Sequence, residues 1–164
     1  MSIRAAAVVW FAMGIGFGAA QAQDLVSVGE VGPWGIYVDP TVGNGCLINA
    51  VFEDGSDVRI GFDMDAGTGY MIAANAGWEG IEEGTEYDVG LDLDGEVYNG
   101  KGTGIILDDL PGVDIPFDTI DFLKDVASKN TLTLSGPDGP VMSIDLADSD
   151  TALQQAIDCQ ENQG

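Results

Sequence analysis

The sequence contains no histidine, which is the usual base of serine and cysteine hydrolases and the commonest zinc ligand. It also carries neither a Gly-x-Ser-x-Gly nor a Ser-x-x-Lys motif, the usual local settings of a serine nucleophile. Nucleophilic hydrolysis therefore has no candidate residues in this chain. We expect no catalytic residue and predict that the protein is not an enzyme.

Positive charge is scarce as well, because five Lys and Arg stand against 28 Asp and Glu, for a formal net charge of -23. Nucleic-acid binders need Lys and Arg to neutralise phosphates, so this class of protein is excluded. An anionic membrane surface is equally disfavoured. The acidity fits a solvated surface that keeps an exported protein soluble. The alternative is attraction of a cationic protein partner, and the sequence leaves both interpretations open.

Long hydrophobic runs are absent except at the N-terminus. Residues 1–4 are a short basic start, residues 5–20 are apolar apart from glycines, and Ala20-Gln21-Ala22 has the small-x-small pattern of a signal-peptidase site. A membrane anchor wants ~20 apolar residues, and this run is shorter. We predict a signal peptide over 1–22, one β-rich domain over 23–164, no membrane span after cleavage, and a periplasmic or secreted location.

Cysteine occurs only twice, as Cys46 and Cys159. In an exported chain this count predicts one disulfide bond between them. Closing so long a loop would stabilise the fold by at most ~4–5 kcal/mol in the chain-entropy model. The alternatives are two free thiols or a bond between two chains.

Alternation of apolar and polar residues predicts several β-strands. One strand begins at Cys46, an Asp-Gly turn at 54–55 follows, and a return strand runs towards Phe62. Residues 70–74 are apolar on both faces, so we place that strand in the middle of the sheet. The clearest alternation, over 87–93, leads through Asp94-Gly95 into a strand over 96–107. The inward residues predicted from these patterns are Cys46, Ile48, Ala50, Phe52, Val58, Ile60, Phe62, Tyr87, Val89, Leu91 and Leu93.

The second half of the chain mixes breakers, helices and strands. We expect residues 108–117 to be irregular because of Pro111-Gly112 and Pro116. A helix should begin at Asp118-Thr119 and bury Ile120, and a second should begin near Ser149 and carry Cys159 in its last turn. Two strands, around 132–134 and 141–146, lie between them. The predicted fold is an antiparallel β-sandwich or flattened barrel of about seven to nine strands with two short helices, the C-terminal one tied by the disulfide to an early strand.

Three local patterns in the sequence are candidate sites. Gly95 to Lys101 has the spacing of a phosphate loop, but Gly102 replaces the Ser or Thr and a strand replaces the helix. The pairs Asp63/Asp65 and Asp92/Asp94 suit calcium ligands only in part, since neither continues into an EF-hand pattern, and Asp is common in turns. We therefore predict no cofactor and no metal.

Glycines at 100, 102 and 104 fall on one face of the predicted strand over 96–107 and leave a groove. Such a groove admits a large side chain or another backbone, and Trp34 and Trp78 are the natural side chains to fill it.

The chain resembles the exported invasion-associated-locus-B-like proteins of alphaproteobacteria in three places. These are the early strand Gly32-Pro33-Trp34-Gly-Ile-Tyr-Val-Asp39, Cys46 at the start of the next strand, and an ending in which Ser143–Leu146 is followed by a helix led by Thr151-Ala-Leu153. It departs from them in having Asp39 near a common cysteine position and no internal cysteine pair. The resemblance implies a β-sandwich-like fold and a periplasmic or secreted location, with no catalytic residues to transfer.

The function that this supports is that of an exported, non-enzymatic binding or envelope-associated protein. Two alternatives are a small carboxylate-dependent hydrolase of envelope glycans, whose carboxylate pair the sequence cannot identify, and an acidic inhibitor of a cationic enzyme such as lysozyme.

Overall fold

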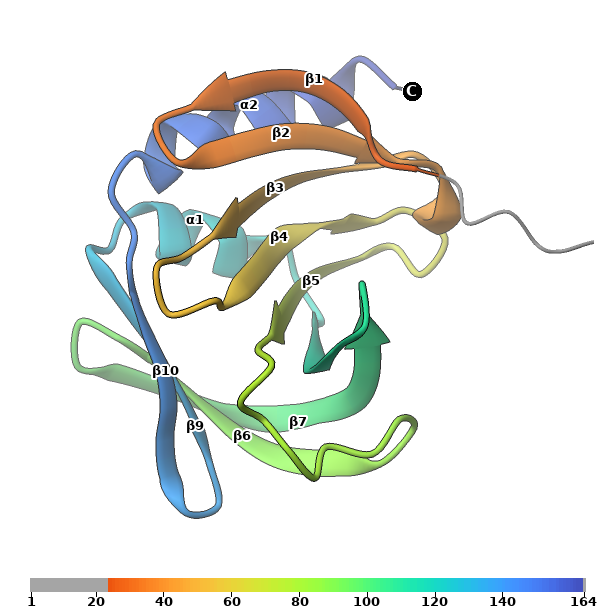
Figure 1. The fold of residues 1–164 in the computed structure, drawn as a ribbon. Helices are drawn as coiled ribbons and strands as arrows, with labels where there is room; N and C mark the ends of the chain where they lie inside the picture. The colour runs from red at the N-terminus through yellow and green to blue at the C-terminus, as the bar shows by residue number, and fades with distance from the viewer. Residues whose placement is uncertain (1–23, 164) are drawn as a thin grey trace, which may run out of the picture.

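The computed structural model describes residues 24–163, and the predicted signal peptide lies outside them. The described part holds one ten-stranded antiparallel sheet and two α-helices (Figure 1). The strands are β1 (Val26–Val31), β2 (Trp34–Asp39), β3 (Gly45–Val51), β4 (Asp57–Asp63), β5 (Thr68–Ala74), β6 (Glu86–Leu93), β7 (Glu96–Leu107), β8 (Leu110–Phe117), β9 (Thr131–Gly136) and β10 (Gly139–Asp145). The helices are α1 (Asp121–Ala127) and α2 (Ser149–Glu161), and a 3-10 turn spans Pro40–Val42.

The strands follow the order β1-β2-β3-β4-β5-β8-β7-β6-β9-β10. The first five form a meander, after which β8 pairs with β5 and the β6–β7–β8 segment runs back across the sheet. In Figure 1 the sheet curls, so that β6 and β7 lie below β1 to β5. The predicted mainly β, antiparallel class is confirmed, and the strand count is slightly higher than expected.

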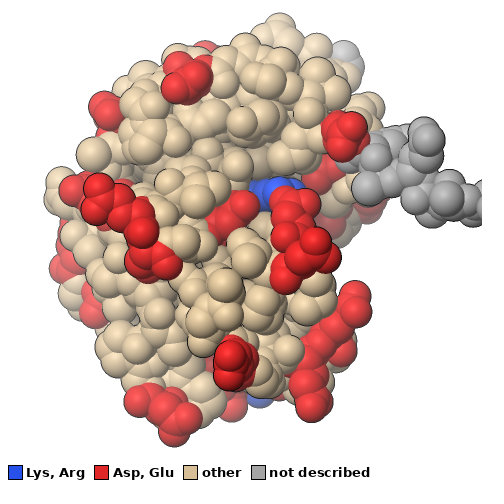
Figure 2. Space-filling model, viewed as in Figure 1, with Lys and Arg blue, Asp and Glu red and all other residues tan. Residues whose placement is uncertain are grey.

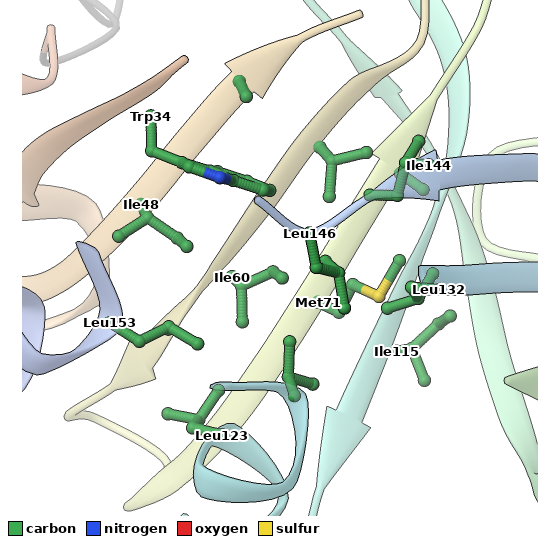
Figure 3. Close-up of a cluster of buried hydrophobic side chains, with 14 of the residues drawn as sticks. Trp34, Ile48, Ile60, Met71, Ile115, Leu123, Leu132, Ile144, Leu146 and Leu153 are labelled. Atoms are coloured by element: carbon green, nitrogen blue, oxygen red, sulfur yellow. The ribbon is translucent and has the colours of Figure 1, made fainter. Parts of the chain in front are cut away.

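One hydrophobic core fills the concave side of the curled sheet. Alternate residues of neighbouring strands point into it, as period-two geometry requires, among them Ile48, Ile60 and Met71. The helices lie behind β1–β4 in Figure 1 and contribute Leu123 and Leu153, which Figure 3 shows beside the strand residues. Both helices and both halves of the sheet therefore share one hydrophobic core.

The predicted disulfide is present. Cys46 on β3 and Cys159 on α2 are joined across a separation of 113 residues, with their Cα atoms 6.1 Å apart. The amide of Cys46 also donates a 2.8 Å hydrogen bond to Oε1 of Gln160. At the other end of α2, the indole Nε1 of Trp34 donates to the carbonyl of Ala147. The helix is therefore fastened to β2 and β3 at both ends.

Two expectations about local structure were wrong. Residues 110–117 form strand β8 despite their prolines and are not irregular. Pro116 has no partner on β7, so this side of β8 is a free edge. Proline lacks an N–H group, and at this free edge its absence costs no hydrogen bond between strands. Helix α1 starts at Asp121, and Phe122 is buried in place of Ile120, which is 48% exposed.

Within residues 24–163, neither helix has the length and apolar character needed to cross a membrane.

Candidate functional site: two clefts beside the β6–β7 hairpin

The sheet opens between β7 and β8. Strand β7 pairs with β6 along the whole of β6, but it pairs with β8 only from Thr103 to Leu107. Strand β8 continues instead along β5 as far as Phe117. The first half of β7 consequently has a free edge, and a cleft of about 580 Å³ lies between this edge, the end of β8 and α1. We call it the α1 cleft.

Three aromatic rings form the floor of the α1 cleft. Phe117 of β8 and Phe122 of α1 stack with ring centroids 3.8 Å apart, and Tyr98 of β7 meets Phe122 edge-on at 5.5 Å. Period two along β8 points Phe117 to the same side as Val113 and Ile115, while the first turn of α1 directs Phe122 back onto it. Phe122 is buried, so the half-buried rings of Phe117 and Tyr98 offer the accessible aromatic surface, which attracts both apolar groups and cations.

Carboxylates surround the aromatic floor. Asp118, Asp121 and Asp125 line the cleft, and Lys101 is the one cation among the lining residues. Lys101 is already bound to Asp88 at 2.8 Å and to Glu86 at 3.3 Å, and Asp121 is paired with Lys124. Within the described residues, Asp118 and Asp125 form no ion pair.

The Tyr98 hydroxyl belongs to the same rim. It donates a long hydrogen bond of 3.4 Å to Oδ2 of Asp125. Hydrogen bonding to Glu96, with the nearby charge of Asp125, raises the pKa of Tyr98 to about 12. The phenol is thus neutral at physiological pH and can donate its proton in this hydrogen bond.

A second opening lies on the other side of β6. Strand β9 pairs with β6 only from Gly90 to Leu93, so residues 86–89 have a free edge there. The loop between β5 and β6 and the β9–β10 turn enclose a cleft of about 420 Å³, which we call the Trp78 cleft. Its walls are mainly apolar, and its lining residues include Trp78, Ile81, Tyr87, Val89, Val113, Leu134, Pro137 and Val141.

The glycines of β7 have different surroundings at the two ends of the row, and Val89 of the neighbouring strand lines both clefts. A side chain at Gly104 would strike the carbonyl of Glu82, so this glycine admits the backbone of the β5–β6 loop. The loop is held there by reciprocal hydrogen bonds, Gly84 N to Gly104 O and Gly104 N to Thr85 O. Gly100 has open space in front of it and lines the α1 cleft. The predicted groove is real, and backbone rather than a tryptophan fills its far end.

Polar groups on the convex face lie outside both clefts. Arg59 pairs with Asp108 at 2.6 Å, and Asn49 donates to Asp57. Burial raises the pKa of the Asp57 and Asp114 carboxyls, and Oδ1 of Asp114 has no hydrogen-bond partner in the described chain. Figure 2 shows Asp and Glu spread widely over one face of the molecule, with little exposed Lys or Arg.

The sequence patterns considered as sites have structural roles. Gly95 lies in the β6–β7 turn and Lys101 on β7, so the phosphate-loop spacing forms a hairpin. Oδ1 of Asp92 accepts the amide of Gly95, and Oδ1 of Asp63 accepts that of Ala66. Asp94 binds the amides of Asn130 and Thr131 and so fixes the start of β9.

Both clefts were missed from the sequence. Their walls come from segments far apart in the chain. The points where pairing of β6 with β9, and of β7 with β8, ends do not alter the alternation of apolar and polar residues. The groove predicted from the glycines at 100, 102 and 104, and the aromatic residues Phe117 and Phe122 on either side of a short acidic link, were the available hints of the α1 cleft.

No family model matches this chain, and no curated protein sequence matches it. Among solved structures, the chain is similar to the crystal structure of invasion associated protein B from Bartonella henselae. The two share 16% sequence identity with a TM-score of 0.58, over 81% of this chain and 97% of that one. The resemblance found in the sequence is thus confirmed at the level of the fold, and the chain has the architecture of that protein.

Proposed function

We propose that the protein is an exported, non-enzymatic binding protein whose α1 cleft holds a basic, partly apolar segment of a cationic partner protein. One observation carries the proposal: a single cleft combines a floor of three aromatic rings with the carboxylates of Asp118 and Asp125, which lack cation partners in the described chain. Lys and Arg cations bind aromatic faces, and rim carboxylates steer a basic partner and fix its orientation.

Export is supported by three independent features. The sequence begins with a predicted signal peptide, the cysteines are paired, and the fold is that of an invasion associated protein. Both a periplasmic and a secreted location fit these features.

A carboxylate-dependent hydrolase has less support from the geometry. General acid catalysis needs a carboxyl with a raised pKa inside a substrate-sized cleft. The two carboxyls with raised pKa, Asp57 and Asp114, line neither the α1 cleft nor the Trp78 cleft.

The test is calorimetric titration of the mature protein with short peptides that alternate Lys or Arg with aromatic residues, and with lysozyme as a cationic protein. We expect saturable binding that weakens about tenfold between 50 and 200 mM salt, since roughly two or three ion pairs form at a partly exposed rim. Gly100→Leu should weaken binding at least tenfold, because the new side chain enters the cleft from open space. Inhibition of lysozyme activity would extend the proposal to the inhibitor class.

A charge-matched pair of variants separates the cleft from the overall field. Asp118→Asn/Asp125→Asn removes two charges from the rim, whereas Glu53→Gln/Asp65→Asn removes two from exposed turns elsewhere. The first double variant should lose about tenfold in affinity and the second less than twofold. Equal losses in both, or full binding by Gly100→Leu, would show that only the net charge matters and would contradict the proposal.

A further inference from the structure

The Trp78 cleft has the size and lining of a site for a small molecule. Its volume of about 420 Å³ lies within the roughly 300–1,000 Å³ of typical ligand pockets. Its walls come from four segments, the β5–β6 loop, β6, β8 and the β9–β10 hairpin, and most of the lining side chains are apolar. Trp78 is half-buried, so its indole remains accessible from the cleft.

The β5–β6 loop, which lines this cleft, is fixed to neighbouring elements by hydrogen bonds near both of its ends. The Tyr87 hydroxyl accepts the amide of Glu82 at 2.9 Å, and the Gly84–Gly104 bond fixes the loop to β7. At the start of the loop, the Asn75 side chain accepts the amide of Gly77 at 2.7 Å and donates to Oγ of Ser56. Since both ends are anchored, the cleft is formed before any ligand enters, which lowers the entropic cost of binding.

The mouth of the cleft selects the charge of the occupant. Glu79, Asp88 and Asp138 line it together with the apolar residues, and no Lys or Arg does. Asp88 is paired with Lys101, while Glu79 and Asp138 form no ion pair in the described part of the chain. An anion would be repelled here, whereas a cation gains from the two carboxylates and from the faces of Trp78 and Tyr87.

We propose that the Trp78 cleft binds a small organic cation with an apolar body, such as an alkyl or aralkyl ammonium ion. The apolar body occupies the space between Trp78, Leu134 and Val141, and the ammonium group lies at the mouth beside Glu79 and Asp138. This site shares only Val89 with the lining of the α1 cleft and does not depend on the function proposed for that cleft.

Trp78 supplies a direct readout. Trp10 falls in the predicted signal peptide, and Trp34 is fully buried with its Nε1 bonded to Ala147, so a ligand-induced change in emission of the mature protein reports on Trp78. Titration with octylammonium, octanol and octanoate, below their micellar concentrations, varies the charge on a constant apolar body. We expect saturable binding in the order octylammonium, octanol, octanoate, with at least tenfold between the first and the last.

Two substitutions locate the site. Gly136 shares the inward face of Leu134 and lines the Trp78 cleft, and a side chain there would make only ordinary contact with Val141. Gly136→Leu should therefore weaken octylammonium binding at least tenfold, while Gly100→Leu, in the other cleft, should leave it unchanged. Glu79→Gln/Asp138→Asn should weaken octylammonium binding about fivefold and leave octanol binding unchanged. Thermal unfolding of each variant checks that it is folded.

Several outcomes would overturn the proposal. Octanoate binding as tightly as octylammonium would remove the argument from charge, and unchanged binding by a folded Gly136→Leu would place the ligand elsewhere. Absence of a saturable change with all three probes would show that the cleft takes no such ligand. Displacement of octylammonium by the basic peptides of the first test would mean one site rather than two. Failure of those peptides to bind, with octylammonium still bound, would contradict only the function proposed for the α1 cleft.

Discussion

The two ends of the sheet differ in how completely their strands are paired. Strands β2, β3 and β4 pair with their neighbours over most of their length, α2 covers their inner face, and the disulfide fastens the helix to β3. Strand β8 pairs with only part of β7, and β9 pairs with only part of β6. A cleft lies beside each unpaired stretch of the β6–β7 hairpin. The comparison shows that one continuous sheet is closely paired and covered by a helix at one end and opens into two clefts at the other.

Removing the disulfide should have the largest effect, and this effect should be strongest at the paired end. Cys46→Ala/Cys159→Ala is expected to lower the free energy of unfolding by about 3–4 kcal/mol, because a long loop is no longer closed in the unfolded chain. Denaturant titration measures the loss. Hydrogen exchange should show the largest acceleration in α2 and β3 and a smaller one in β6 and β7. Equal acceleration in all four elements would remove the distinction between the two ends.

Two glycine substitutions within β7 test how the β5–β6 loop is attached at the open end of the sheet. Gly104→Ala forces a methyl group against the carbonyl of Glu82 and is expected to cost about 2 kcal/mol, with looser attachment of the β5–β6 loop. Gly100→Ala meets open space and should be neutral or stabilising by about 0.5 kcal/mol, since alanine narrows the unfolded ensemble. Thermal unfolding compares them. Similar values for the two would mean that the loop does not rest on Gly104.

Asp114 allows a smaller test on β8, the strand between the two ends. Burial, with the nearby charge of Asp63, raises the pKa of the Asp114 carboxyl above its usual value in the folded protein. Folding therefore favours the neutral form, and its contribution to stability is full below about pH 4 and is lost as the pH rises through the raised pKa. Asp114→Asn should raise the free energy of unfolding by about 1 kcal/mol at pH 7 and leave it unchanged at pH 3. A pH-independent difference would contradict this.

Much of the fold could be predicted from local patterns. The inward residues Val58, Ile60 and Phe62 follow from alternation, and the hairpin at Asp94-Gly95 follows from turn chemistry. Strand β8 was missed because Pro111 and Pro116 outweighed its alternation, and only the neighbouring strands determine that its ends tolerate proline. Neither cleft could be predicted as a whole, because Tyr98 meets Phe122, and Trp78 and Leu134 line one cleft, only through the packing of distant segments.

The sequence by itself determined the β-rich class, the acidic surface and the single possible disulfide, because alternation, charge and cysteine count are local or compositional properties. Tertiary structure alone decided where the strands of the sheet part. Which edge remains free depends on the path of β8 along β5 and on the reach of β9 along β6, and these are set by packing of the whole core. The clefts, and with them the proposed functions, arise from that packing.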